Sequence, residues 1–386
     1  MTLPSQVDAP LPDETQVQLQ AAVERAVAAS GSSGAAVGAW APWSGSWLAG
    51  VGTVLPQGAA TPADATFKIG AVTRAMTCDV LYGLVADGVV ELGDQVGDYV
   101  PGLAGNEVAP DATTTGAAPA GEITLGQLCD STGGLSSYAP LIEARLRAAP
   151  TRSWNPRELL AYGLSRGVAT TPGTTFADSD TGYVLLGVAL ERASGKTAAA
   201  LYEQYVFDPV GMPASALPTA ADVELGGLWS GDAEDGSVAC AAPLDMTALS
   251  PSAGFTASGV TSDLTDIGRY VQALAVGARS YDTDKRFDAP LPVWAGGPSW
   301  FTASGGAYQA GSLIGQYGSL PGYLTAAFAD RSTGMTVVVA LNNSRASADL
   351  VRSLAWELAA IASKAPAASG QTLPEAGLPW TAEDMA

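Results

Sequence analysis

The chain has 386 residues, of which 18 are basic and 38 acidic, so its formal net charge is −20. Such a surface repels phosphates and anionic lipids, and we therefore expect neither nucleic acid nor a membrane as a partner. The chain contains no histidine, which excludes a Ser-His-Asp triad and any zinc site that uses imidazole.

Three cysteines, Cys78, Cys129 and Cys240, are far apart in the sequence and odd in number. We therefore expect buried free thiols and no disulfide framework. Met1–Pro12 lacks the basic start and apolar run of a secretory signal. No apolar stretch approaches the roughly 18 residues that span a bilayer. These features predict a cytoplasmic protein, and a leader removed upstream would leave the same sequence.

The first part of the chain predicts helices that flank a β-hairpin. Residues 14–29 have an amphipathic pattern that ends at Gly31, and residues 72–87 form a second helical pattern closed by Gly88. Between them, residues 35–41 and 46–54 are small and apolar with interspersed tryptophans, as expected for two strands of a hairpin.

The middle of the chain predicts mainly helices. Residues 104–120 are rich in Ala, Thr, Pro and Gly without periodicity and predict a surface loop. Asn155-Pro156 is a typical cap and first turn for a helix to about residue 165. Further helical patterns cover residues 181–193 and 262–275.

The C-terminal part predicts a hairpin and a long helix. Residues 323–330 and 335–341 are the strands, and residues 347–363 are helical with one apolar face. A Pro/Ala/Gly-containing tail follows from residue 365. Strands at both ends of the chain, with helices between them, predict one antiparallel sheet closed by the two termini.

Several runs resemble a known family, in its usual order along the chain. They are FKIGAVTRAMTCDVLYGLVADGVVELGDQVGDYVPGL from Phe67, LCDSTGGLSSY from Leu128, PGTTFADSDTGYVLLGVALERASGKT from Pro172, YVFDPVGMP from Tyr205, SGVTSDLTDIGRYVQAL from Ser258 and GQYGSLPGYLTAAFADRSTGMTVVVALNN from Gly315. The sequence is similar to the serine β-lactamase-like, penicillin-recognising hydrolases, which include class C β-lactamases, DD-peptidases and related esterases. The resemblance covers most of residues 15–363.

This resemblance implies an α/β fold of the α+β type, in which an antiparallel sheet is flanked by helices and a mainly helical subdomain is inserted. We expect a tail at residues 1–12, a β-lactamase-like domain at 13–363 and a second tail at 364–386. Within the domain, the sheet subdomain should comprise about 13–70 and 250–363, and the helical subdomain about 71–249. The cleft between the subdomains is the expected ligand site.

The motifs that carry the family's chemistry are replaced here. Ser-x-x-Lys, in which the lysine takes the serine proton, reads Ala71-Val72-Thr73-Arg74. Tyr-x-Asn reads Asp178-Ser179-Asp180, and Lys/His-x-Gly reads Gln316-Tyr317-Gly318. The loop that often reads His-x-Ser-Gly-Leu is Ser131-Thr132-Gly133-Gly134-Leu135. A methyl group cannot attack, and arginine stays protonated at neutral pH.

We expect Arg74 to face Asp178 or Asp180. Two interpretations stay open: a salt bridge that neutralises an old polar pocket, or a new acid/base site in which one carboxylate donates a proton and the other accepts one. Two aspartates without a third ligand give little support for a metal site. Cys78 shares a helical face with Ala71 and Arg74 but lies two turns deeper, which favours core packing over a nucleophilic role.

The resemblance places further substrate-binding candidates in the same cleft, namely Ser131, Gln316, Tyr317 and Ser319. We expect no cofactor and no metal, and a small molecule as partner; the oligomeric state is open. Three functions fit: an enzyme that uses Asp178, Asp180 and Arg74 on a small molecule, as a hydrolase, lyase or glycosidase; a catalytically inactive ligand-binding protein; or a weak esterase-like hydrolase. Fold resemblance alone does not choose among them.

Overall fold

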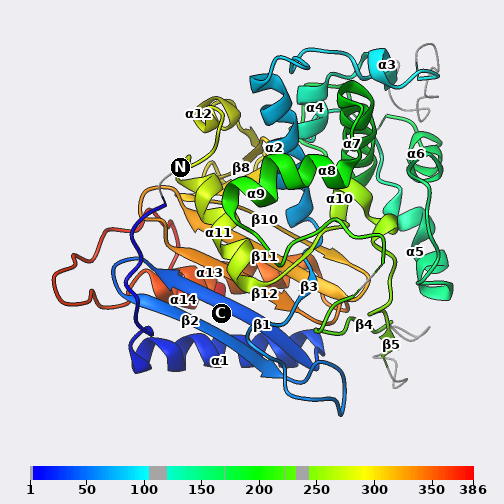
Figure 1. Cartoon of the computed structure of the whole chain (residues 1–386). Helices are drawn as coiled ribbons and strands as arrows, with labels where there is room; N and C mark the ends of the chain where they lie inside the picture. Colours follow the sequence, from blue (N-terminus) through cyan, green and yellow to red (C-terminus); the bar gives the residue numbers. More distant parts are fainter. Residues whose placement is uncertain (1–2, 104–119, 169, 221, 232–242) are drawn as a thin grey trace.

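The computed structural model describes residues 3–103, 120–168, 170–220, 222–231 and 243–386. An eight-stranded antiparallel sheet forms the centre, in the order β2-β1-β12-β11-β10-β9-β8-β7 (Figure 1). Its strands are β1 (Gly34–Ala41), β2 (Gly45–Gly52), β7 (Leu291–Pro292), β8 (Phe301–Ser304), β9 (Ala307–Ala310), β10 (Leu313–Leu320), β11 (Tyr323–Asp330) and β12 (Thr336–Leu341). The N-terminal hairpin joins the C-terminal one because β1 pairs with β12, which confirms the predicted closure of the sheet by both ends of the chain.

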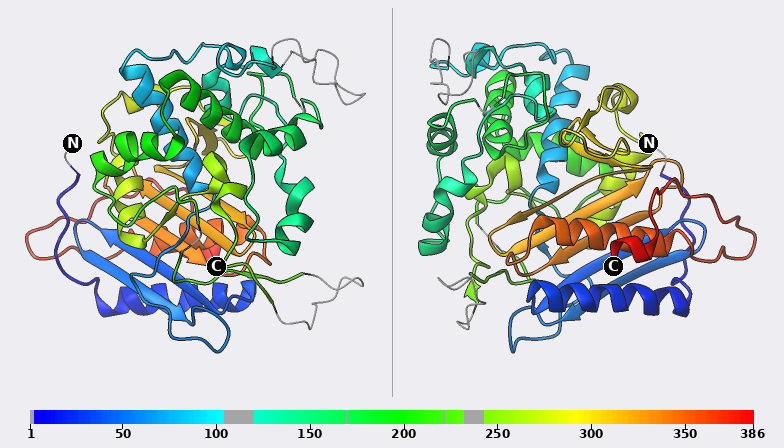
Figure 2. Two further views of the ribbon diagram at one scale, coloured as in Figure 1. Left: turned by 45° about the vertical axis from the view of Figure 1, so that its right-hand side comes forward. Right: turned by 180° about the vertical axis from the view of Figure 1, so that it is seen from behind.

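Two layers of helices cover the two faces of this sheet. One face packs against α13 (Ala348–Ala362), beside which lie α1 (Asp13–Ser30) and α14 (Ala382–Met385), as the view from behind in Figure 2 shows. The other face packs against α11 (Leu264–Ala275) and α2 (Val72–Ala86). Along β12, alternate side chains belong to the two separate cores, Val337 and Val339 to one and Val338 to the other. This alternation follows from the two-residue period of a strand.

A mainly helical region extends from the face of the sheet that carries α2 (Figure 1). Its remaining helices are α3 (Val96–Tyr99), α4 (Leu125–Cys129), α5 (Ala139–Ala148), α6 (Pro156–Leu164), α7 (Asp180–Ser194), α8 (Ala198–Tyr202), α9 (Asp208–Val210), α10 (Phe255–Ser258) and α12 (Thr283–Arg286), with short helical turns at Ala120–Glu122, Glu203–Phe207 and Pro251–Ala253. Two small ladders pair β3 (Phe67–Lys68) with β6 (Thr261–Ser262), and β4 (Leu228–Trp229) with β5 (Leu244–Asp245).

The helices and strands predicted from the sequence are present, with ends shifted by at most two residues. The cap at Asn155 is also confirmed, since its side chain accepts a hydrogen bond from the Arg157 amide at 2.9 Å. The predicted loop at 104–120 lies almost wholly outside the described residues. No helix in the described part of the chain is both long and apolar enough to cross a membrane.

The segments predicted as tails contact the body of the protein. Leu11 is buried, and its amide donates to the Ser46 carbonyl at 2.9 Å. Near the C-terminus, Trp380 is buried and stacks on Trp356 with ring centroids 4.8 Å apart, and both contact Trp300. The subdomain boundaries given above remain predictions.

The expectation of free thiols at Cys78 and Cys129 is wrong. These two residues form a disulfide that links α2 to the end of α4, with Cα atoms 5.5 Å apart. They are 51 residues apart in the sequence, and spacing alone does not show that α2 and α4 pack side by side. Cys240 lies outside the described residues.

Replacing both Cys78 and Cys129 by alanine is expected to lower the free energy of unfolding by about 4 kcal/mol, because the open chain gains entropy in the unfolded state. Urea unfolding followed by fluorescence measures this loss. The Cys240→Ala variant keeps the cross-link and is the matched control. Equal midpoints for the double variant and the control would show that the disulfide does not stabilise the fold.

Candidate functional site

The site begins where β3 turns into α2. Gly70 has φ +54°, and a side chain there would meet Leu320 and Thr325 at about 3 Å. The Thr325 hydroxyl donates to the Ile69 carbonyl at 2.8 Å, which holds the turn against the sheet. The next residue, Ala71, therefore lies beside β10. A Cβ placed on Gly318 would come within 2.5 Å of the Ala71 Cβ, so the two backbones approach closely only because residue 318 is glycine.

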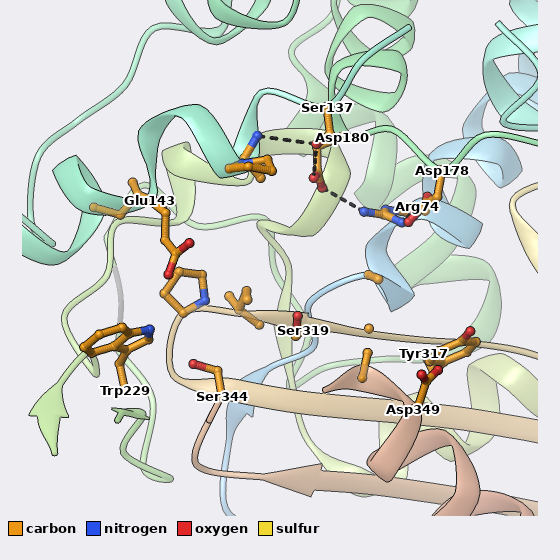
Figure 3. Close-up of a pocket in the computed structure, with 18 of the residues that line it drawn as sticks. Arg74, Ser137, Glu143, Asp178, Asp180, Trp229, Tyr317, Ser319, Ser344 and Asp349 are labelled. Carbon is orange, nitrogen blue, oxygen red and sulfur yellow. Dashed lines mark hydrogen bonds and ion pairs between the residues drawn. The ribbon is translucent and has the colours of Figure 1, made fainter. Parts of the chain in front are cut away.

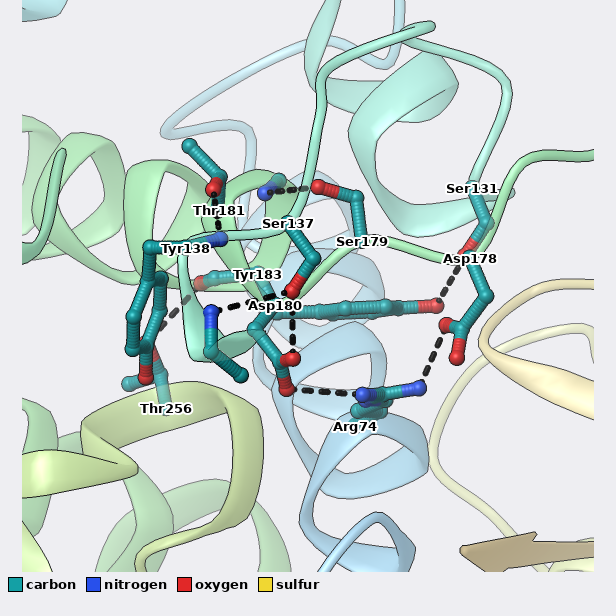
Figure 4. Close-up of polar contacts among 12 residues, drawn as sticks. Arg74, Ser131, Ser137, Tyr138, Asp178, Ser179, Asp180, Thr181, Tyr183 and Thr256 are labelled. Atoms are coloured by element: carbon teal, nitrogen blue, oxygen red, sulfur yellow. Dashed lines mark hydrogen bonds and ion pairs between the residues drawn. The ribbon is translucent and has the colours of Figure 1, made fainter. Parts of the chain in front are cut away.

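Arg74 lies one turn further along α2 and binds two carboxylates at once (Figure 4). One guanidinium nitrogen, Nη1, pairs with Asp178, and the other, Nη2, donates to Asp180 Oδ1 at 2.8 Å. The Arg74 side chain is 8% exposed, against 43% for Asp178 and 18% for Asp180. Burial alone would lower the pKa of Arg74, but the two carboxylates raise it well above its usual value. The residue is therefore a permanent cation.

The two aspartates are positioned by the N-terminus of α7. Ser179 caps this helix by accepting a hydrogen bond from the Gly182 amide at 3.3 Å. Asp180 begins the helix, and its second oxygen accepts from the Ser137 hydroxyl at 2.7 Å. Both oxygens of Asp180 are thus bonded, whereas Asp178 uses only Oδ1 among the described contacts.

Tyr183 lies beneath the guanidinium of Arg74, with its ring centroid 5.4 Å from the Arg74 Cζ atom. Its hydroxyl donates to the Cys129 carbonyl and contacts the Ser131 hydroxyl, each at 2.9 Å (Figure 4). Burial raises the pKa of the Tyr183 phenol, and Arg74 opposes this only in part. The phenol is therefore neutral and serves as a hydrogen-bond donor and as an aromatic support for the cation.

A cavity of about 520 Å³ opens beside these groups (Figure 3). This volume is in the range of small-molecule sites. The cavity lies between the helical region and the C-terminal end of β10, and polar and aromatic side chains line it. Its lining residues include Ala71, Arg74, Ser137, Glu143, Asp178, Asp180, Trp229, Tyr308, Tyr317, Ser319, Ser344 and Asp349.

Six of the eight residues selected from the sequence line this cavity: Ala71, Arg74, Asp178, Asp180, Tyr317 and Ser319. The structure does not bring Ser131 and Gln316 into it. Ser131 is buried against Tyr183, and the Gln316 amide donates to the Gly306 carbonyl at 3.1 Å, behind the cavity wall. Both side chains form hydrogen bonds within the protein, and neither lines this cavity.

Sequence reasoning missed a second group of lining residues, which come from elements with no recognised motif. Glu143 is on α5, Trp229 on β4 and Asp349 in the first turn of α13. Only the three-dimensional fold brings these distant elements together. Within the described part of the chain, no group of three or more Cys, Asp or Glu side chains is placed to hold a metal ion.

With this geometry established, the comparisons with known proteins identify the family. The sequence profile of the Beta-lactamase family matches residues 19–361, which is most of the chain. The chain belongs to the β-lactamase family. A curated protein to which the chain is similar is the D-alanyl-D-alanine-carboxypeptidase/endopeptidase AmpH of Escherichia coli strain K12, 32% identical over 152 residues. That match covers 39% of this chain and 36% of the relative, so the chain spans about a third of the length of the relatives it matches.

Solved structures of this β-lactamase-family fold include three instructive neighbours. A D-stereospecific amidohydrolase from Streptomyces sp. has a TM-score of 0.75 and 23% identity, covering 89% of this chain and 98% of that one. The D-amino acid amidase from Ochrobactrum anthropi SV3, complexed with D-phenylalanine, has a TM-score of 0.68 and 22% identity, with 86% and 92% covered. An octameric penicillin-binding protein homologue from Pyrococcus abyssi has a TM-score of 0.69 and 17% identity, with 88% and 75% covered. These likenesses show the fold, and they confirm its predicted class.

Replacing Arg74 by methionine is expected to destabilise the protein by about 3 kcal/mol, because Asp178 and Asp180 would then face each other without a cation. Chemical unfolding at neutral pH measures the loss. The triple variant Arg74→Met/Asp178→Asn/Asp180→Asn removes the repulsion and should regain much of the stability. An unchanged unfolding midpoint in the single variant would show that the ion pairs are not needed.

Lys68 lies behind the main cavity and lines a smaller one of about 60 Å³ that shares Asp180 and Ser319 with it. The side chain is buried, and its amine donates to the Thr247 carbonyl. Burial lowers the pKa of Lys68 to about 8, although the Asp245 carboxylate acts in the opposite direction. At a pH between this value and the usual 10.5, the unfolded chain binds the extra proton, so stability rises with pH in that window.

We subtract the unfolding free energy of Lys68→Met from that of wild type at each pH. This difference is expected to increase by about 2 kcal/mol between about pH 7 and about pH 9.5. Urea titrations at several pH values measure this change. The exposed Lys364→Met variant is the matched control and should follow the wild-type profile. Parallel profiles for all three proteins would show that the Lys68 amine titrates as it does in the unfolded chain.

Proposed function

We propose that this chain binds a small molecule in the 520 Å³ cavity without forming a covalent ester to it. The observation that supports this proposal is the position of Ala71. It stands at the start of α2, where the resemblance places the nucleophilic serine, and its methyl group lines the cavity. A methyl group has no lone pair with which to attack a carbonyl carbon.

The neighbours of Ala71 support the same proposal. A serine at the helix start would need a base to take its proton, and Arg74 is a permanent cation engaged with both Asp178 and Asp180. Tyr183 is neutral, and its hydroxyl donates a hydrogen bond to the Cys129 carbonyl. Neither Arg74 nor Tyr183 is therefore able to take the proton of a hydroxyl group at position 71.

Incubation with a chromogenic cephalosporin, an aryl ester or D-phenylalanine amide is expected to leave the intact mass of the protein unchanged. The Ala71→Ser variant should behave in the same way, because Arg74 cannot activate the new hydroxyl. Intact-mass spectrometry over hours measures any adduct. A stable acyl adduct on any Ser, Thr or Cys of the wild-type chain would refute the proposal.

A second candidate function is acid/base catalysis by the aspartates, and one observation favours it. The Asp178 side chain is 43% exposed, lines the cavity, and has an oxygen without a hydrogen-bond partner among the described residues. That oxygen is able to accept a proton from a bound substrate, with Arg74 holding the carboxylate in place. Asp180, whose two oxygens are both bonded, would act as a positioning residue.

If a substrate is found by metabolite screening, Asp178→Asn should reduce kcat by at least about 100-fold, as expected for loss of a general base. Asp180→Asn should reduce it less and also raise KM, because it loosens Arg74. The exposed Asp98→Asn variant is the control. Full turnover in both site variants would rule out acid/base roles, and ligand-induced stabilisation without conversion would favour binding alone.

A further inference from the structure

The charged side chains that line the cavity are mostly acidic. Among the described residues that line it, Arg74 is the one cation, and the acids are Glu143, Asp178, Asp180 and Asp349. Figure 3 shows the Glu143 carboxylate directed into the cavity on the side that holds Trp229. A cavity of this kind repels anions, because carboxylates in a partly enclosed space focus the negative potential.

The cations that compensate this charge lie mostly outside the cavity. Arg74 neutralises one of the two aspartates it binds, and Arg352 pairs with Asp349 at 2.7 Å. One further cation, Arg147, lies 4.0 Å over the Trp229 ring without lining the cavity. Lys68 lies against the smaller adjoining cavity and is the fourth nearby cation, so the four carboxylates and these four cations balance overall. Of the four cations, however, only Arg74 lines the cavity itself, whereas all four carboxylates do.

Glu143 is the carboxylate with the least compensation. Its side chain is on the exposed surface of α5, and the described residues provide neither a hydrogen bond nor an ion pair for it. A carboxylate on a cavity wall without an internal partner is available for a ligand. The unbonded oxygen of Asp178 is available in the same way on another part of the wall.

Aromatic rings complete the wall. Trp229, Tyr308 and Tyr317 line the cavity, and the Tyr308 and Tyr317 rings contact each other with centroids 4.7 Å apart. Aromatic faces bind apolar groups and also attract cations through their quadrupole. Carboxylates and aromatic faces together favour a ligand that has a positive charge and an apolar body.

We infer that the cavity binds a small organic ammonium ion with an apolar or aromatic body, its charge matched by Glu143 and Asp178. This inference rests on the proposed function, since it names the class of ligand for the same cavity. An ammonium ligand brings a positive charge to a cavity lined mainly by carboxylates, whereas a carboxylate ligand would add a further negative charge there.

Three probes of similar size and different charge test the inference: phenethylamine, 2-phenylethanol and 3-phenylpropanoate. Titration calorimetry at pH 7.5 and low ionic strength measures each Kd. We expect phenethylamine to bind about tenfold more tightly than the alcohol, and the carboxylate to bind more weakly still. Raising the salt concentration to about 0.5 M should narrow these differences, because ions screen partly exposed charges.

Glu143→Gln should weaken phenethylamine binding about three- to tenfold and leave the alcohol unchanged. Since Glu143 is exposed and makes no internal bond among the described contacts, this variant should fold normally. Glu24→Gln, on the exposed face of α1, is the matched control for the overall negative charge and should bind all three probes as wild type does.

The outcomes separate the inference from the proposed function. Equal affinity for the three probes, no detectable binding of phenethylamine at low salt, or the same loss in both glutamate variants would overturn the inference and leave non-covalent binding of another ligand in place. A covalent adduct would instead count against the proposed function. So would a broad metabolite panel in which no compound raises the melting temperature.

Discussion

Two carboxylates and one guanidinium group hold together the starts of α2 and α7, which are more than 100 residues apart in the sequence. A buried charge is costly unless partners replace the water that it loses, and here Asp178, Asp180 and the Tyr183 ring do so. This interaction holds Arg74, Asp178 and Asp180 in place on one side of the cavity. If Arg74 is removed, the two carboxylates are left beside each other without a cation.

This arrangement also limits the chemistry of the site. In the serine hydrolases that this chain resembles, the lysine one helical turn after the nucleophilic serine takes the serine proton. Arg74 stays charged, and the carboxylates beside it stabilise that charge. The Ala71 methyl group lies against Gly318 of β10, and the two backbones approach closely because residue 318 has no side chain.

Features that depend on residues close together in the sequence could be predicted, whereas features that depend on packing between distant segments could not. Helix caps, the two hairpins and the pairing of Arg74 with the aspartates were predictable, because they rest on short-range patterns or on the order of the family's motifs. The Cys78–Cys129 bond was not, since it depends on how α2 packs against α4. The same holds for Glu143 and Trp229, which reach the cavity from segments without a motif.

Ser131 and Gln316 were predicted from the motifs to line the cavity, but they do not. They lie where the motifs place them in the chain, but their side chains bond to Tyr183 and to the Gly306 carbonyl. A motif fixes the position of a backbone segment, whereas the direction of a polar side chain depends on the nearest unsatisfied donor or acceptor. Side-chain direction was therefore the least predictable property of this site.

The aromatic cluster of Trp300, Trp356 and Trp380 has an optical consequence. Three of the nine tryptophans of the chain lie in ring contact, and one of them, Trp380, belongs to the last few residues. Its indole is shielded from water and stacked on a neighbouring fluorophore. Detachment of the C-terminal segment alone would expose that indole and shift its emission to longer wavelength, so local fraying of the chain end has a spectroscopic signal of its own.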